Sequence, residues 1–138
     1  MKKNRLEIEY SYDFELLGLT TSAKSYKLAW ELNRNLKIRL TRKPDLQIHT
    51  RSKMLSYSFH EHEGTANTLR LFRNKPNEAE QSRNLLVPEC PQGDYILMVQ
   101  GEDSLSKRLQ EELRNITSIE LVAFIPLDAL KSKDNFIF

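Results

Sequence analysis

Cysteine, glycine and long apolar runs are all scarce in this sequence, and each shortage excludes a class of protein. The single cysteine, Cys90, cannot form an internal disulfide or a cysteine-rich metal site. Four glycines in 138 residues leave little room for a phosphate-binding glycine loop, and no Gly-x-Ser-x-Gly nucleophile elbow occurs. No apolar run approaches the roughly 18 residues of a membrane-spanning helix. Because acidic residues stand where a signal peptide needs its apolar core, we expect a cytoplasmic protein without membrane association.

An excess of charge of one sign is also missing. Charged residues make up 29% of the chain, but the formal net charge is only +2, which singles out no partner. The hydrophobic content of 39% suits an ordinary globular protein. A chain of this length buries roughly two thirds of its unfolded surface when it folds, enough for one core. The sequence therefore predicts a single domain over residues 1–138.

Alternation of apolar and polar residues predicts strands over most of the chain. The expected strands are residues 6–19, 36–41, 46–49, 54–61, 68–73, 94–100 and 119–125. Pro44 and Asp45 are expected to break the chain between the second and third of these. Residues 54–61 and 68–73 are expected to pair as a hairpin, because a turn segment containing Gly64 separates them. In the last strand, we expect Ile119, Leu121, Ala123 and Ile125 to face one way.

Two amphipathic segments predict helices. The first covers about residues 22–35, with Thr20, Thr21 or Ser22 as its cap. The second is capped by Asp103 or Ser104, carries the apolar stripe Leu105, Leu109 and Leu113, and ends at Asn115. Because the strands mostly follow one another without helices between them, we predict an α+β fold: a single antiparallel sheet of about five to six strands, with the two helices packed on one face.

The most metal-like feature is the pair His60 and His62, which share one face of a strand and which His49 could join from a neighbouring strand. Two histidines without a clear third ligand more often lie on a solvent face near a turn. They are weak metal ligands, and we predict neither a metal nor another cofactor.

A basic stretch suggests contact with nucleic acid. Lys37, Arg39, Arg42 and Lys43 belong to a run without an acid, and Arg70, Arg73 and Lys75 lie on a strand that could join the same sheet. A basic sheet face with Tyr57 or Phe72 for stacking is typical of single-strand binding. Basic residues on an edge strand also simply prevent edge pairing, so the second interpretation is a solvated edge.

No catalytic residue is predicted. Cys90 has no histidine near it in sequence, so only the fold could supply the base that a nucleophile needs. A metal-binding protein or an enzyme built on His60, His62 and the carboxylates of residues 87–95 is a third possibility.

The segment VPECPQGDY, residues 87–95, combines restricted and polar residues directly before the most apolar run. Pro88 and Pro91 restrict the residues before them to extended geometry, and Gly93 can adopt a positive φ that turns the chain into the strand. Glu89 and Asp94 can accept hydrogen bonds from unpaired backbone N–H groups. Tyr95 can bury its ring while its hydroxyl finds a partner.

The alternative is that Glu89, Asp94 and Tyr95 form a polar cluster at the end of the sheet, where a ligand or a partner protein docks.

The same nonapeptide resembles an uncharacterised bacterial family named for its motif Ile-Pro-Glu-x-x-x-Val-Asp-Tyr. The motif positions are Val87, Pro88, Glu89, Asp94 and Tyr95. Val87 replaces the isoleucine of the motif and Gly93 replaces its valine. The resemblance extends over most of the chain, but only the nonapeptide is specific. It implies a bacterial protein and brings no established activity, ligand or catalytic residue with it.

From these features we predict a non-catalytic binding or protein-interaction module. Its partner is a second copy of the chain in a homodimer or an unknown protein. The alternative is an RNA-associated protein that uses Lys37, Arg39, Arg42 and Lys43.

Overall fold

The computed structural model describes residues 13–50, 53–77, 84–101 and 105–136. The helices and strands are β2 (Phe14–Thr21), α1 (Ser25–Leu36), β3 (Thr41–His49), β4 (Met54–Glu63), β5 (Asn67–Arg73), β6 (Tyr95–Gly101), α2 (Leu105–Arg114) and β7 (Ile119–Ile125). Two short 3-10 turns follow, η2 (Leu127–Ala129) and η3 (Lys133–Phe136). None of the described helices is long and apolar enough to cross a membrane.

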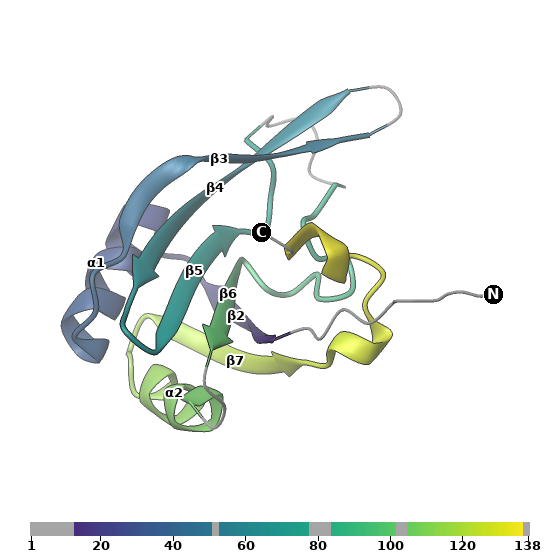
Figure 1. Ribbon diagram of the computed structural model, residues 1–138. Helices are drawn as coiled ribbons and strands as arrows, with labels where there is room; N and C mark the ends of the chain where they lie inside the picture. Colours follow the sequence, from purple (N-terminus) through teal and green to yellow (C-terminus); the bar gives the residue numbers. More distant parts are fainter. Residues whose placement is uncertain (1–12, 51–52, 78–83, 102–104, 137–138) are drawn as a thin grey trace.

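The strands form one antiparallel sheet of six strands in the order β3-β4-β5-β6-β2-β7. Both helices pack on the same face of this sheet (Figure 1). The predicted α+β class, with two helices on one face of an antiparallel sheet, is therefore confirmed. The predicted hairpin is also present, because Phe59 pairs with Phe72 and Glu63 with Thr68.

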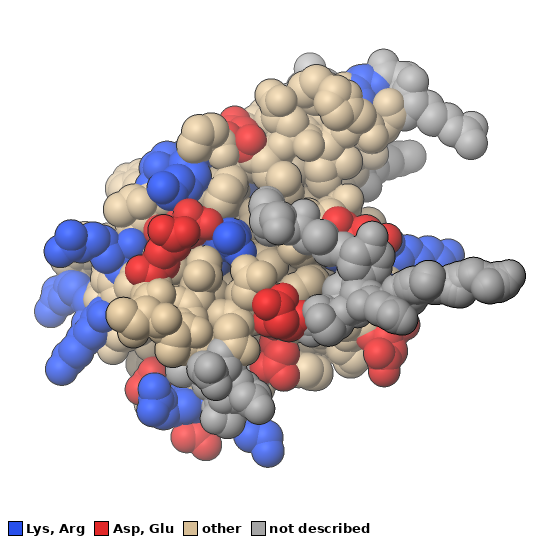
Figure 2. Space-filling view, viewed as in Figure 1, with Lys and Arg blue, Asp and Glu red and all other residues tan. Residues whose placement is uncertain are grey.

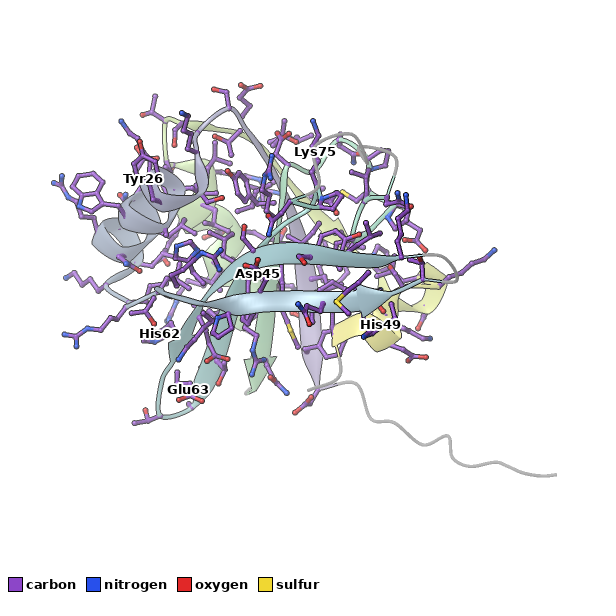
Figure 3. All side chains as sticks on the ribbon, turned by 90° about the horizontal axis from the view of Figure 1, so that it is seen from above. Tyr26, Asp45, His49, His62, Glu63 and Lys75 are labelled. Carbon is purple, nitrogen blue, oxygen red and sulfur yellow. The ribbon has the colours of Figure 1, made fainter. Side chains whose placement is uncertain are left out.

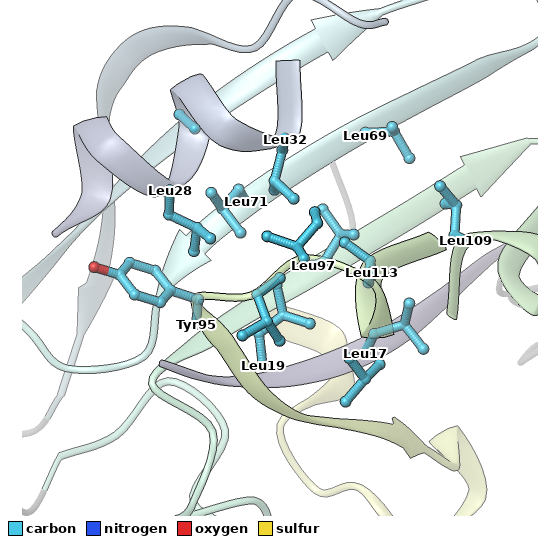
Figure 4. Packing of buried hydrophobic residues seen from close by; sticks show 14 of the residues in the cluster. Leu17, Leu19, Leu28, Leu32, Leu69, Leu71, Tyr95, Leu97, Leu109 and Leu113 are labelled. Carbon is cyan, nitrogen blue, oxygen red and sulfur yellow. The ribbon is translucent and has the colours of Figure 1, made fainter. Parts of the chain in front are cut away.

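The helix face of the sheet holds the larger core cluster. Leu28 and Leu32 of α1 and Leu109 and Leu113 of α2 are buried against leucines of β2, β5 and β6 (Figure 4). Tyr95 lies in this cluster beside Leu28. The helices thus cover the central strands of the sheet.

The opposite face of the sheet is covered by segments that belong neither to the two α-helices nor to the strands. Leu86, Val87 and Cys90, which precede β6, are buried there together with Leu130 and Phe136 of the C-terminal turns. Figure 1 shows these turns in yellow, on the side of the sheet away from the helices. The nonapeptide therefore contributes directly to a second core.

A row of paired residues crosses the helix face and becomes polar toward the edge strand β3. Leu97 of β6 pairs with Leu71 of β5, Leu71 pairs with His60 of β4, and His60 pairs with Arg42 of β3. Paired residues of neighbouring strands point to the same face of the sheet. Arg42 and His60 therefore lie on the helix face, next to the hydrophobic core and closer to the edge of the sheet.

The region before β3 corrects two predictions. Residues 36–41 do not form a strand: Leu36 ends α1, and Lys37 is in the left-handed conformation, φ 57°. Pro44 and Asp45 do not break the chain into two strands, because β3 runs from Thr41 to His49 with a register shift at this point. A bulge on an edge strand tolerates a proline, which cannot donate a hydrogen bond to the ladder.

The start of α1 also differs from the prediction. The N-cap is Lys24, and no side chain caps the helix. Thr21 Oγ1 instead accepts a hydrogen bond from Ala23 N at 3.1 Å, so the threonine orders the turn before the helix. The second helix ends at Arg114, as expected, and Leu109 and Leu113 are buried. Its predicted caps, Asp103 and Ser104, lie outside the described residues, as does the side chain of Leu105.

The last strand does not keep one apolar face. Its pairing with β2 shifts between Thr20 and Thr21, so Ile119 belongs to the helix-side core and Ile125 to the opposite core. Leu121 is 51% exposed. The prediction of a shared face was wrong because a bulge reverses the alternation of side chains.

Candidate functional site

A cavity of about 900 Å³ opens on the helix face of the sheet, beside the N-terminal end of α1. Ser58 and His60 of β4 and Arg73 of β5 line it from the sheet. Residues 21–26 line it from the side of α1, and Arg42 of β3 with residues 75 and 77 completes the wall. In Figure 3, Tyr26 and Lys75 lie on the same side of the β3–β4 hairpin.

Two residues of the nonapeptide fix the segment that leads into α1. Asp94 Oδ2 accepts a hydrogen bond from Thr21 N at 2.9 Å. The hydroxyl of Tyr95 donates to the carbonyl oxygen of Ala23 at 2.8 Å, while the Tyr95 ring is buried in the core. Both residues also line the cavity. The start of α1 is therefore held at the cavity by contacts from the start of β6.

The N-terminus of α1 directs uncompensated partial positive charge at the cavity. The first helical hydrogen bond runs from Leu28 N to Lys24 O, so the N–H groups before it have no intrahelical acceptor. The first turn carries no acidic residue, and no side chain caps it. A helix N-terminus in this state favours an anion.

Cations surround the same cavity. Lys24, Arg73 and Lys75 line it, and none of them forms an ion pair within the described residues. Arg42 also lines it and pairs with Asp45 at 2.8 Å. Among the described residues of the lining, Asp94 is the one acidic residue. The lining is therefore strongly cationic, although the whole chain is nearly neutral.

Two buried polar side chains of β4 face the cavity without a partner. His60 is 9% exposed, Ser58 is equally buried, and neither side chain makes a hydrogen bond within the described part of the chain. Burial lowers the pKa of His60, and the nearby positive charge of Arg42 lowers it further. A neutral imidazole and a hydroxyl, both desolvated, are thus available to a ligand.

This arrangement suits the binding of an anion rather than covalent chemistry. It offers positive charge, helix N–H groups and two unpaired polar side chains, all of which can contact phosphate oxygens. Among the described residues, no group of three or more histidine, cysteine or acidic side chains is close enough to hold a metal ion.

The nonapeptide itself forms two consecutive turns, which corrects the prediction of an extended segment. Cys90 N donates to Val87 O at 3.0 Å, and Gly93 N donates to Cys90 O at 3.1 Å. Pro88 and Pro91 each occupy the second position of a turn, which their fixed φ favours. Gly93 does not have a positive φ.

The reason for glycine at position 93 is close packing. A Cβ at Gly93 would lie 3.1 Å from Cys90 Sγ, and one at Gly18 of β2 would lie 2.7 Å from the same sulfur. The thiol of Cys90 is therefore enclosed by two glycines. Burial raises its pKa, although a hydrogen bond from Gly93 N partly opposes the rise.

Asn74, directly after β5, organises both turns. It is fully buried; its Oδ1 accepts from Val87 N at 2.8 Å, and its Nδ2 donates to Gly93 O at 2.8 Å and Cys90 O at 3.2 Å. The only signal for this role in the sequence is that Asn74 directly follows an expected strand, and this signal is not specific.

Glu89 is exposed and faces away from the cavity side. Its carboxylate accepts hydrogen bonds from Lys131 N at 2.9 Å and Ser132 Oγ at 3.1 Å. Partial burial acts to raise the pKa of Glu89, but these hydrogen bonds outweigh it, and the pKa lies below its ordinary value. Glu89 thereby fastens the C-terminal turns to the nonapeptide, whereas Asp94 fastens the start of α1.

The four basic residues of the nucleic-acid prediction do not form one strand face. Lys37 and Arg39 are exposed in the connection between α1 and β3, and Lys43 lies 3.9 Å from Glu61 on the face opposite Arg42. Arg70 likewise pairs with Glu61, at 2.7 Å. Figure 2 shows basic side chains gathered over α1 and the start of β3, with acidic ones next to them. Only Arg42 reaches the cavity.

The three histidines are also dispersed. His62 Nδ1 accepts a hydrogen bond from Arg39 N at 3.0 Å and does not line the main cavity. His49 pairs with Met54 and lies at the opposite end of the hairpin from His62 (Figure 3). Against expectation, His60 is buried and not on a solvent face.

The cavity thus combines one or two members of each separate prediction: Asp94 and Tyr95 of the nonapeptide, Arg42 of the basic stretch and His60 of the histidine pair. A scan against protein-family models finds no match for this chain, and a search of curated proteins finds no significant relative.

Proposed function

We propose that the protein is a non-catalytic binding protein whose cavity takes up a ligand bearing a phosphate group. The observation that carries this proposal is the state of His60. Within the described part of the chain, the buried imidazole has no hydrogen-bond partner, and it faces a cavity lined by three cations without ion pairs and by an uncapped helix N-terminus. An unsatisfied buried polar group costs about 1–3 kcal/mol, which a ligand oxygen would offset.

Charge selects the class of ligand. Lys24, Arg73 and Lys75 bring positive charge that no acid of the described chain neutralises, and Asp94 already accepts a hydrogen bond from Thr21. A phosphate dianion would contact donors from both the helix and the sheet. The cavity volume of about 900 Å³ falls within the range of small-molecule sites, which leaves room for a group larger than phosphate itself.

Isothermal titration calorimetry with inorganic phosphate, pyrophosphate and sodium chloride tests this proposal. We expect phosphate and pyrophosphate to bind, and chloride at equal ionic strength to give no saturable heat. Arg73→Gln should weaken binding roughly tenfold or more, since a charge-assisted hydrogen bond contributes about 1.5–3 kcal/mol.

Lys107→Gln is the matched control, because Lys107 is exposed on α2 and does not line the cavity. Equal binding by wild type and Arg73→Gln, or equal losses in both variants, would refute a site in this cavity.

We also propose that the chain belongs to the motif family that its nonapeptide resembles. Membership of the motif family is supported by the nonapeptide alone, and its turn geometry explains why Gly93 can replace valine: Cys90 Sγ occupies the space a larger side chain would need. Location in the cytoplasm and self-association as a homodimer are likewise proposed from the sequence.

A further inference from the structure

An exposed aromatic and basic ridge runs along α1 from the mouth of the cavity. Tyr26 lines the cavity and is 71% exposed, and Trp30 is 54% exposed. The guanidinium carbon of Arg34 lies 5.0 Å from the centre of the Trp30 ring. Because these residues are spaced four apart, they occupy one stripe of the helix. We call Tyr26, Trp30 and Arg34 the α1 ridge.

Exposed aromatic side chains that lie next to one another often mark a binding surface. Here the other face of α1, with Leu28 and Leu32, is buried in the core, so the ridge adds nothing to the packing of the sheet. Tyrosine and tryptophan rings beside an arginine are the side chains on which unpaired nucleobases stack. The ridge is continuous with the cavity through Tyr26, which belongs to both.

We propose that the protein binds the end of a single-stranded nucleic acid that carries a terminal phosphate. The terminal phosphate enters the cavity and contacts Arg73, Lys75 and the N-terminus of α1. The first bases lie outward along the α1 ridge, on Tyr26 and Trp30. This inference rests on the phosphate-binding function proposed above and names its ligand.

The spacing along α1 fits this arrangement. Tyr26 and Trp30 are separated by one turn of helix, a rise of about 6 Å, and Arg34 follows after another. Lys24 at the N-cap and Arg34 further along place positive charge at both ends of the aromatic pair, where the sugar-phosphate backbone of the strand passes. A phosphorylated peptide would use the cavity but would have no bases for the ridge.

The single tryptophan of the chain provides a direct readout, because Trp30 is the only source of tryptophan fluorescence. Short oligonucleotides of five residues, RNA and DNA, are titrated in three forms: 5′-phosphorylated, 3′-phosphorylated and without a terminal phosphate. We expect saturable quenching, with one phosphorylated form binding roughly tenfold more tightly than the form without phosphate.

Variants separate the ridge from the cavity. Trp30→Ala should weaken oligonucleotide binding, measured by calorimetry, roughly tenfold, because stacking on one aromatic typically contributes about that factor. It should leave pyrophosphate binding unchanged, because Trp30 does not line the cavity. Phe124→Ala is the matched control: Phe124 is 47% exposed on β7 and does not line the cavity. It should change neither affinity. Circular dichroism checks that both variants fold.

The outcomes distinguish the two proposals. If pyrophosphate binds but oligonucleotides neither quench Trp30 fluorescence in the wild type nor lose affinity in Trp30→Ala, the nucleic-acid inference is wrong and the phosphate site stands. Tighter binding of a phosphoserine peptide than of any oligonucleotide also overturns it. If neither pyrophosphate nor oligonucleotides bind, the phosphate-binding function itself fails.

Discussion

The carboxylate of Asp94 and the backbone N–H of Thr21 are 73 residues apart in the chain and 2.9 Å apart in the fold. This hydrogen bond joins the residue directly before β6 to the last residue of β2, from which the chain leads into α1. It thereby helps to set the N-terminus of α1 at the rim of the cavity. It gives Asp94 a structural task, although the residue lies among candidate ligand-binding groups.

Replacing Asp94 should therefore lower the stability of the fold but strengthen the binding of an anion. Asp94→Ala removes the acceptor of the Thr21 N–H group and should lower the free energy of unfolding by about 1–3 kcal/mol. Asp94→Asn keeps an oxygen acceptor and should cost less. Because both variants remove an acidic side chain from the cavity lining, pyrophosphate should bind more tightly to Asp94→Asn than to wild type. Thermal denaturation and calorimetry measure the two effects. Weaker binding by a stably folded Asp94→Asn would contradict this role.

Glu89 should stabilise the protein at neutral pH and lose this effect in acid. Its pKa is lowered in the folded protein, so its stabilising effect is present above the ordinary carboxylate pKa and is lost as the pH falls through the folded value. Glu89→Gln should therefore lower the melting temperature at pH 7, and the difference from wild type should shrink as the pH falls below the ordinary carboxylate pKa. Scanning calorimetry from pH 3 to 7 tests this; parallel curves with a constant offset would argue against it.

The histidine in the cavity should couple binding to protons. His60 has a lowered pKa, so the unfolded chain binds more protons near pH 6, and stability should fall as the pH drops below about 6.5. The charged groups that share its cavity among the described residues are Lys24, Arg42, Arg73 and Lys75, which oppose protonation, and Asp94, which favours it. A phosphate dianion would raise the pKa of His60, so binding should tighten between pH 7 and 6. An NMR titration of the His60 ring with and without pyrophosphate reports this directly. The same pKa in both titrations would refute the coupling.

Packing around the buried thiol gives a prediction independent of any ligand. A Cβ at Gly18 would lie 2.7 Å from Cys90 Sγ, so Gly18→Ala should destabilise the protein by about 1–3 kcal/mol. The double variant Gly18→Ala/Cys90→Ala should recover part of this loss, because the clashing sulfur is gone. Urea denaturation of the four proteins of this double-mutant cycle measures the coupling. Strictly additive effects would show that the two residues do not press on each other.

The sequence pattern correctly predicted those elements whose structure depends mainly on residues close together in the chain. The β4–β5 hairpin, the doubly covered strand β6 and the buried stripe of α2 all follow from hydrophobic period and turn residues. The errors fall at edges and bulges. Pro44 is tolerated because β3 is an edge strand, and Ile119 faces the helix-side core, away from Ile125, because the pairing of β7 with β2 contains a register shift. Both depend on neighbouring strands, which a single segment does not reveal.

The candidate site could be predicted only in pieces. His60, Arg42 and Asp94 were each singled out for a different reason, but their meeting depends on the strand order β3-β4-β5-β6 and on the position of α1. The uncapped start of α1 was missed because Thr21, a good capping residue, is used one turn earlier. Lys24 therefore stands at the N-cap, and this is what opens the helix terminus to a ligand.

The central claim is that an anion occupies the space between α1 and β4, and one NMR experiment tests it most directly. Pyrophosphate is added to isotope-labelled protein, and backbone amide and histidine ring signals are followed. The amides of Ser25 and Tyr26 and the ring of His60 should shift together, with a common dissociation constant, while the ring of His49 stays unchanged. Shifts confined to Lys37 and Arg39, or no saturable shift at His60, would contradict the claim.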